Sequence, residues 1–453
     1  KEFQRIKNIL KIHQDYYKAI LDNIFHNFIY FIQNFDLIEE WLLSDDFYEK
    51  YKKENHPYPS LLDPKKLNDK NEKINYHTIP AELAWEMNLP LPDNYEFVWL
   101  GGHGTGTEAL KTFFLYNNVV IPDNYLNYET GLQRYQYALN LLLSDTDYIK
   151  AIRLKDYYFH DFEKFCKLIQ KKCKFIFQIR DYFEIFTCYI NHRSRKSDAV
   201  MKFNLESNLD EVFDRFYYFS SGENHPISLN LKNFLSWNIL HQDMGFRTCI
   251  MEYSMLQNFD NVLSVCYIDM KDIVGDNTKI TMEKICNFLN IIYHPNYNYN
   301  NIIGDLKIIF PLTLDISQIT SSNVELLIVE FDFIFDSNLY DDITLKIICS
   351  KMFKILIKKS DLELMDNFVI EKLQSYFYYF DAALNDKLIQ EKQQIRIKEQ
   401  QYLDIYKQDV YRRKKLQEMM NYEITHIKQH RPDIVASWKY YQEFEKMCEE
   451  LDG

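Results

Sequence analysis

The chain has 453 residues, of which 16% are aromatic, and it contains only 10 glycines and 11 prolines. This composition excludes a fibrous or intrinsically disordered protein and favours several folded parts of roughly 150 residues each. A formal net charge of −13 argues against a general nucleic-acid binder, which is usually basic, although one local positive pocket can still hold an anion.

The apolar runs and the eight cysteines indicate the cellular compartment in which the protein is expected. No two cysteines form a CxxC pair and most lie within apolar runs, which is typical of free buried thiols in a reducing cytosol. No apolar run approaches the roughly 18 residues of a membrane-spanning helix, so no transmembrane segment is expected. We therefore expect a cytoplasmic protein, with the inner face of the membrane as an alternative location.

Four parts are expected along the chain. Residues 1–60 carry apolar side chains at helical spacing and predict an N-terminal helical segment. Residues 75–300 alternate strand-like and helix-like runs, which indicates an α/β core with a mostly parallel sheet flanked by helices. Residues 301–384 are mixed α/β. Residues 385–453 predict a C-terminal helical segment, in which 385–430 has the pattern of one long amphipathic helix.

The most informative segment is PDNYEFVWLGGHGTGTEALKTFFLYNN. Glu96–Leu100 predicts a strand and Glu108–Tyr116 a helix, and the loop between them is rich in glycine. Such a loop lets successive backbone N–H groups and the positive end of the helix surround a phosphate, while threonine hydroxyls add donors. The residues predicted to contact the phosphate are Gly102, His103, Gly104, Thr105, Gly106 and Thr107.

Two other nucleotide-binding patterns fit this loop less well. A Walker A loop requires a lysine where Thr107 stands, so ATP hydrolysis is not expected. A Rossmann loop requires GxGxx[GA], which residues 104–109 satisfy, and Asp123 lies near the position of a ribose-binding carboxylate. However, Asp123 follows Pro122 in a short apolar segment that is a poor second strand, so NAD binding stays the weaker alternative.

Two further strand–helix units follow. KFIFQIRDYFEIFTCYI predicts a strand that ends at Arg180, and an arginine at the carboxyl end of a parallel strand is well placed to bind phosphate. The third unit consists of the helix NFLSWNILHQ, the strand VLSVCYIDM and the helix TMEKICNFLNI. Asp269, near the end of that strand, is predicted to be structural.

These blocks resemble the sulfotransferase superfamily in order and spacing. WLGGHGTGTEAL is similar to the family loop GxxKxGTxxL, which holds the donor's 5′-phosphate, with Gly104 at the position of the family lysine. Arg180–Asp181 is similar to the family's R[ND]P motif, and VLSVCYIDMKDI with its following helix is similar to YEDL…FL. The family serine that binds the 3′-phosphate is Cys188 here, beside Thr187. The resemblance therefore implies a 3′-phosphate held by Arg180, Thr187 and Cys188.

The run IPAELAWEMNLPLPDNYEFVWLGGHGTGTEALKTFFL narrows the resemblance to bacterial capsular polysaccharide O-methyl phosphoramidate transferases, over residues 55–380. This resemblance implies a sulfotransferase-like P-loop core and a 3′-phosphorylated cytidine diphosphate donor that carries the phosphoramidate. It also implies a sugar hydroxyl of capsular polysaccharide as acceptor, with residues 301–384 on the acceptor side. No tightly bound cofactor is expected. A sulfotransferase using 3′-phosphoadenosine 5′-phosphosulfate, and a non-enzymatic interaction protein with a vestigial loop, stay open as alternatives.

Catalytic residues follow from the chemistry of such a transfer. In-line attack by a sugar hydroxyl requires donors on the leaving phosphate oxygen and a base for the hydroxyl. His103 is predicted to donate to the bridging oxygen where the resemblance places a lysine. The resemblance directs the search for the base to the region before the arginine motif, where His160 is the first candidate. Lys155 is the third catalytic candidate, because Lys155 and Arg153 can contact phosphates.

Other histidines give weaker patterns. His241 and Asp243, in ILHQDMGF, form a second acid–base candidate. His426 and His430 lie four residues apart in THIKQH, but a metal site needs further ligands, so surface histidines and no metal are expected. The apolar face of the C-terminal helical segment predicts contact with the body of the protein or with a second copy of the chain.

Overall fold

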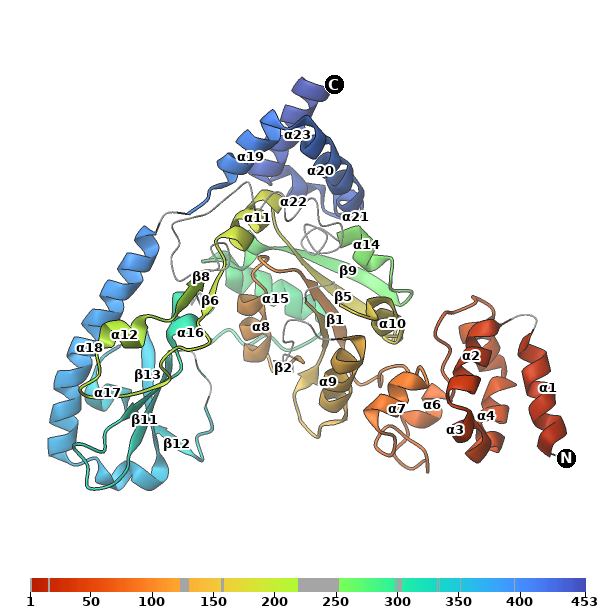
Figure 1. Ribbon diagram of the computed structural model, residues 1–453, viewed down its shortest axis with the longest axis horizontal. Coiled ribbons are helices and arrows are strands. Elements are labelled where there is room, and N and C mark those ends of the chain that lie inside the picture. The colour runs from red at the N-terminus through yellow and green to blue at the C-terminus, as the bar shows by residue number, and fades with distance from the viewer. Residues whose placement is uncertain are drawn as a thin grey trace. The chain divides into compact units, whose positions relative to one another are not determined.

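The computed structural model divides the chain into two compact units, each built from separate stretches of sequence (Figure 1). Unit 1 comprises Lys1–Ile185, His241–Tyr299 and Tyr406–Gly453, and unit 2 comprises Phe186–Leu240 and Asn300–Ile405. The structure describes residues 2–14, 17–122, 130–155, 159–218, 252–297, 299, 304–331, 333, 335–350, 352–394 and 396–453. The expected helix NFLSWNILHQ and the candidates Asp123, His241 and Asp243 lie outside these described residues.

Within the described residues, the centre of unit 1 is a four-stranded parallel sheet with the strand order β4-β1-β5-β9. The chain passes from β1 to β4 on one side of β1 and then to β5 on the other side. The winding therefore reverses between β1 and β5, and ligands of open α/β sheets bind outside the carboxyl ends of the strands at such a reversal. The four strands are β1 Phe97–Gly101, β4 Ile152–Leu154, β5 Cys173–Ile179 and β9 Val262–Asp269.

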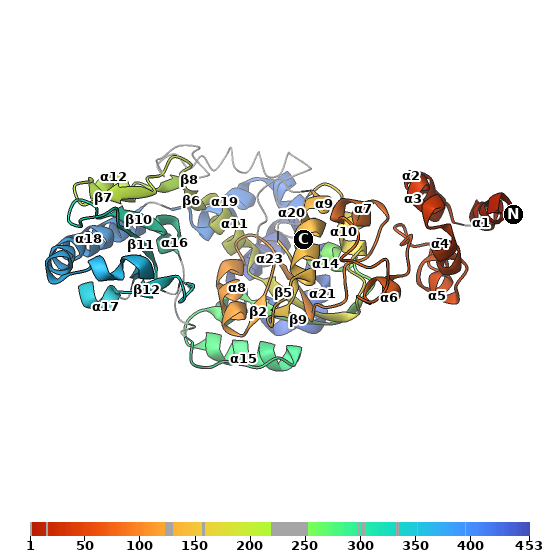
Figure 2. The same ribbon diagram turned by 90° about the horizontal axis from the view of Figure 1, so that it is seen from below.

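Helices lie against this sheet, as Figure 1 and Figure 2 show. Trp99 and Ile176 are buried in one apolar cluster with residues of α8 (Thr107–Tyr116) and α15 (Asn277–Leu289). Because successive strand residues point to opposite faces, Tyr267 faces the other way, towards the C-terminal helices, and its hydroxyl lies 2.7 Å from Nδ1 of His426. The predicted α/β class, with a parallel sheet flanked by helices, is confirmed. Smaller elements of unit 1 are β2 Val119–Val120, α9 Gly131–Leu143, β3 Ile149–Lys150, α10 Phe162–Lys167, α14 Glu252–Leu256 and the 3-10 helix η3 Met270–Ile273.

The N-terminal region is helical, as predicted, but it consists of short helices. Two asparagines mark the breaks: Asn27 Nδ2 donates to Asn23 O at 3.1 Å, and Asn34 Nδ2 donates to Tyr30 O at 3.0 Å. Such side chains compete with the backbone for hydrogen bonds and end the regular helix. The elements are α1 Glu2–Gln14, α2 Lys18–His26, α3 Phe28–Gln33, α4 Phe35–Leu42, α5 Asp45–Phe47, the π-helical turn η1 Tyr48–Lys52, α6 Pro64–Leu67 and α7 Ala81–Glu86.

The C-terminal region is also helical, but the prediction of one long helix over 385–430 is wrong. The side chain of Asp409 accepts a hydrogen bond from Arg412 N at 3.0 Å and so starts a new helix. Before it, the side-chain amide of Asn191 exchanges two hydrogen bonds with the backbone of Ile397 and holds a non-helical link. The helices are α18 Asn367–Gln393, α19 Glu399–Gln408, α20 Val410–Glu423, α21 Thr425–His430, α22 Pro432–Ala436 and α23 Lys439–Asp452.

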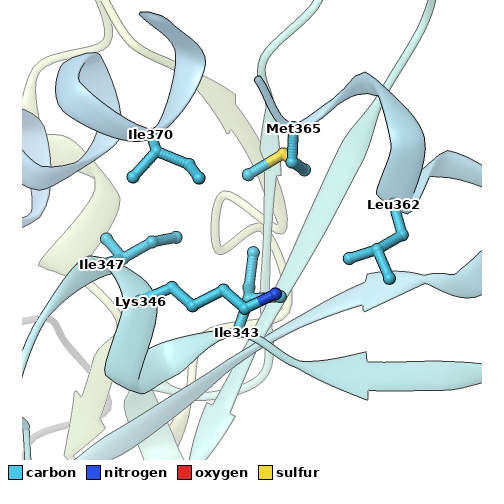
Figure 3. Close-up of a pocket in the computed structure, with 6 residues that line it drawn as sticks. All are labelled: Ile343, Lys346, Ile347, Leu362, Met365 and Ile370. Atoms are coloured by element: carbon cyan, nitrogen blue, oxygen red, sulfur yellow. The ribbon is translucent and has the colours of Figure 1, made fainter. Parts of the chain in front are cut away.

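Unit 2 contains a five-stranded sheet of order β12-β13-β11-β10-β7, in which β7 and β10 are parallel and the other neighbours antiparallel. A small apolar pocket of about 60 Å³ lies beside it, between α17, η4 and the start of α18 (Figure 3). The elements of unit 2 also include the last part of α11 (Tyr182–Ile190) and β6 Arg193–Arg195, β7 Lys202–Asn204, α12 Leu209–Phe213, β8 Phe216–Tyr218, α16 Asp305–Ile309, β10 Leu312–Asp315, β11 Glu325–Glu330, β12 Tyr340–Asp342, α17 Thr344–Ile347, β13 Phe353–Lys358 and η4 Lys359–Leu364.

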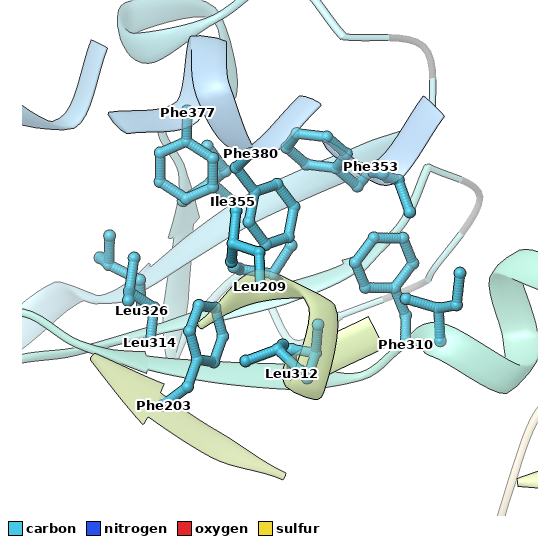
Figure 4. Close-up of a cluster of buried hydrophobic side chains, with 14 of the residues drawn as sticks. Phe203, Leu209, Phe310, Leu312, Leu314, Leu326, Phe353, Ile355, Phe377 and Phe380 are labelled. Atoms are coloured by element: carbon cyan, nitrogen blue, oxygen red, sulfur yellow. The ribbon is translucent and has the colours of Figure 1, made fainter. Parts of the chain in front are cut away.

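The core of unit 2 forms where α18 packs on the sheet (Figure 4). Phe380 is fully buried, and its ring lies 5.1 Å from that of Phe213 and 5.5 Å from that of Phe353. These aromatic contacts join the long helix, a sheet strand and the short helix α12 into one core.

Replacing Phe380 with Ala will remove this contact and leave a cavity, at a cost of about 3–5 kcal/mol in the free energy of unfolding. The neighbouring Tyr379 is 65% exposed and provides the matched control, because Tyr379→Ala should change stability far less. Urea unfolding of both variants checks this, and equal losses would contradict the described core.

Two histidines of the N-terminal region have lowered pKa values: His13 is buried and His56 is half-buried. Burial lowers the pKa of His13 to about 4, with the charge of Lys52 as a smaller cause. Burial also lowers the pKa of His56 to about 4. Among the described residues, neither ring nitrogen of His13 has a hydrogen-bond partner, so protonation would leave a buried, unpaired charge.

Between pH 4 and the ordinary value of 6.5, the unfolded chain binds more protons at these two residues than the folded chain. Stability will therefore be lost as pH falls through this window. His13→Leu removes one of the two titrating groups. The acid-induced loss in the free energy of unfolding should therefore be smaller by roughly 3 kcal/mol in this variant. Urea unfolding at pH 7 and at pH 4.5 measures how steeply the free energy of unfolding falls with pH. His26→Gln is the control, because His26 is exposed. If His13→Leu loses as much stability between pH 7 and pH 4.5 as the native chain does, the His13 ring does not titrate in this window.

Candidate functional site

The loop between β1 and α8 is a tight turn. Gly104 and Gly106 have φ angles of 83° and 87°, a left-handed conformation that strongly favours glycine. The hydroxyl of Thr105 donates to Gly102 O at 2.8 Å and closes the turn. Because the first N–H groups of a helix have no partners within the helix, this turn lies where an anion can be bound at the start of α8.

The β5 side of the loop is held by two side chains. Gly101 pairs in register with Gln178, whose Nε2 donates to Thr105 O at 2.7 Å. Arg180 follows β5; its Nη1 donates to Gly104 O at 3.0 Å and its Nε to Glu184 Oε2 at 2.7 Å. The structure therefore brings together the glycine-rich loop and the arginine that the sequence predicted to share a ligand.

The β4 side carries two more cations. Arg153 and Lys155 both contact Glu108, in the first turn of α8: the nitrogen-to-oxygen distances to Glu108 Oε1 are 3.3 Å from Arg153 Nη2 and 3.1 Å from Lys155 Nζ. Arg153 is fully buried and its guanidinium lies 4.4 Å from the centre of the Trp99 ring. The register between Leu100 and Leu154 places Lys155 beside the start of the loop.

Glu108 is ionised at neutral pH despite its partial burial. Burial opposes ionisation, but the positive charges of Lys155, Arg153 and Lys111 outweigh it and lower the pKa of the Glu108 carboxyl to about 2. Sequence reasoning missed this residue, although an acidic residue directly after Thr107 was the available signal. Cations therefore flank the loop on both sides: Arg180 on the β5 side, and Arg153 and Lys155 on the β4 side. The Glu108 carboxylate contacts the two cations on the β4 side.

Two aspartates at the same edge of the sheet contact the C-terminal helices instead. Asp181 accepts hydrogen bonds from Tyr440 N at 2.9 Å and Phe183 N at 3.0 Å, and its burial raises the pKa to about 6. Asp269 accepts from Trp438 Nε1 at 2.6 Å. Both carboxylates thus accept hydrogen bonds from the start of α23, and this contact is what the structure shows for Asp269, which was expected to be structural.

The remaining predicted residues occupy different places. His103 lies in the loop and is half-buried. The side chain of His160 is 79% exposed, and its Nδ1 lies 2.7 Å from Asp161 Oδ2. Thr187 and Cys188 belong to unit 2, where the Thr187 hydroxyl donates to Glu399 Oε1 at 2.7 Å. Arg180 therefore contacts the loop and Lys155 contacts the first turn of α8, whereas the His160 side chain is paired with the adjacent Asp161.

The histidine pair of α21 is engaged in packing. The rings of His426 and His430 stack with centres 3.9 Å apart, next to Tyr267. No group of three or more potential metal ligands occurs among the residues that the structure describes. Within the same residues, no helix is long and apolar enough to cross a membrane.

Residues 267–451 match a family described as a protein of unknown function (DUF2972). The matched region begins in β9 and ends in α23, so it contains the contacts of Tyr267 with His426 and of Asp269 with Trp438, but not the glycine-rich loop. No curated protein and no solved structure matches the chain.

Gly106 allows a direct test of the loop. A Cβ added there would collide with the sulfur of Met270, and the positive φ adds strain of roughly 1–2 kcal/mol. Gly275 is the matched control, because its φ is 66° but an added Cβ meets no described atom within 4 Å. We expect Gly106→Ala to lower the unfolding free energy by more than Gly275→Ala, measured by urea denaturation. Equal effects would mean that Met270 does not restrict the loop.

Proposed function

We propose that this protein is a transferase that moves an O-methyl phosphoramidate, or a related phosphoryl or sulfuryl group, from a 3′-phosphorylated nucleotide to a sugar hydroxyl of capsular polysaccharide. The observation that carries the proposal is the contact between Arg180 and Gly104 O. It joins the two blocks of sequence that resemble the phosphate-binding motifs of sulfotransferases. The sulfotransferase-like P-loop core is part of this proposal.

The residues around the loop suit a leaving nucleotide. In the transfer, a bond forms between the sugar oxygen and the phosphorus, and the bond from phosphorus to the bridging oxygen of the nucleotide breaks. Negative charge builds on that leaving oxygen, while the proton of the sugar hydroxyl passes to a base. The loop N–H groups, His103 and Lys155 would stabilise the leaving charge, and the fork of Arg180 would hold a phosphate of the nucleotide.

The proposed base is His160. Its Nδ1 is paired with Asp161, which orients the ring and makes the other nitrogen, Nε2, the proton acceptor. The first turn of α9 connects His160 with the β4 side of the site, since Gly131 N donates to His160 O at 2.7 Å and Arg134 Nη1 donates to Lys155 O at 2.6 Å.

A thermal-shift titration tests the proposal. The ligands are 3′-phosphoadenosine 5′-phosphate, 3′-phosphocytidine 5′-diphosphate, CDP, ADP and NAD. A ligand that binds only the native fold at 100 times its Kd stabilises it by about 2.7 kcal/mol. We expect the two 3′-phosphorylated nucleotides to raise the melting temperature, with a greater effect from the cytidine compound, and Arg180→Ala to abolish the shift.

Arg412→Ala is the matched control: Arg412 of α20 pairs with Asp409, which precedes that helix, so the variant should leave ligand binding unchanged. A larger shift with the adenosine compound would assign the donor to the sulfuryl class. A shift with NAD alone would favour the dinucleotide alternative. If no nucleotide stabilises the native protein, the transferase proposal fails.

A further inference from the structure

Glu108 is an unexpected residue at a site that would bind an anion. It lies in the first turn of α8, where an ionised carboxylate repels any phosphate bound at the helix N-terminus. The Glu108 side chain is also 45% exposed, so it is not buried out of reach of a ligand. The same oxygen of Glu108 contacts both Lys155 and Arg153, the two cations on the β4 side of the loop.

We propose that Glu108 is an internal competitor of the ligand, a carboxylate that occupies Lys155 and that a nucleotide phosphate must displace from this lysine. This inference rests on the proposed function of the same loop and adds a residue that controls affinity there. The competition favours phosphate groups with two negative charges, because they attract Lys155 more strongly than one carboxylate does.

The positions of the two cations indicate that Glu108 competes with a ligand rather than merely holding the cations in place. The side chain of Arg153 is fixed by complete burial and by the Trp99 ring, so it does not depend on Glu108 alone for its position. Lys155 is 25% exposed and flexible enough to turn from Glu108 to a phosphate. Glu108 therefore regulates the charge that the loop presents, and Lys155 is the side chain that exchanges partners.

The test is Glu108→Gln, which keeps the shape and removes the charge. Binding of 3′-phosphoadenosine 5′-phosphate and 3′-phosphocytidine 5′-diphosphate is measured by isothermal titration calorimetry on the full chain, with folding checked by circular dichroism. We expect affinity to rise by roughly tenfold, equal to about 1.4 kcal/mol. The gain should shrink at high salt. If Glu108 only supports the cations, affinity will fall or stay the same, which would overturn the inference.

Two further variants make the result specific. In the Lys155→Met background, Glu108→Gln should raise affinity much less, because the exchanged cation is missing. Glu449→Gln removes the same charge from an exposed position of α23 and should leave affinity unchanged. If the native chain binds the nucleotides but Glu108→Gln does not bind them more tightly, only this inference fails. If neither protein binds any of them, both the inference and the proposed function fail.

Discussion

The position of β1 between β4 and β5 is the constraint on which the candidate site depends. Parallel pairing places the carboxyl ends of all three strands at one edge, so the residues that follow β4 and β5 flank the loop that follows β1. Lys155 and Arg180 are 25 residues apart in sequence, yet both contact the loop or the first turn of α8. The strand order, rather than any local motif, brings these charges together.

The same edge explains why the last helices belong to unit 1. Buried carboxylates need hydrogen-bond donors, and Asp181 and Asp269 obtain them from the backbone of Tyr440 and the ring of Trp438. The start of α23 therefore completes the edge of the sheet beside the loop. This arrangement gives a physical reason why a family match can begin in β9 and continue to α23: the two ends of the matched region are packed on one another.

Much of the core could be read from the sequence because its signals are local. The strand before Gly101, the helix after Thr107 and the strand before Arg180 each have a clear apolar pattern, and their adjacency follows from alternation of strands and helices. The prediction of a single helix over 385–430 is wrong because one side chain, that of Asp409, is enough to start a new helix. A single aspartate does not interrupt the apolar pattern from which the long helix was predicted. The partnership of Thr187 with Glu399 spans more than 200 residues of sequence, and no pattern in either segment indicates it.

Glu108 shows why the role of a loop is harder to predict from the sequence than the position of a strand. Negative side chains are favourable in the first turn of a helix, so Glu108 stabilises α8 by the same electrostatics that make it unfavourable for a bound anion. The chain as a whole carries a net charge of −13, and long-range repulsion adds to this local effect. The proposed phosphate would bind only if nearby cations outweigh both repulsions, and Lys155, Arg180 and the buried Arg153 are the positive charges available for this. Under this proposal, the stability of α8 and the affinity of the loop for an anion place opposing demands on one carboxylate.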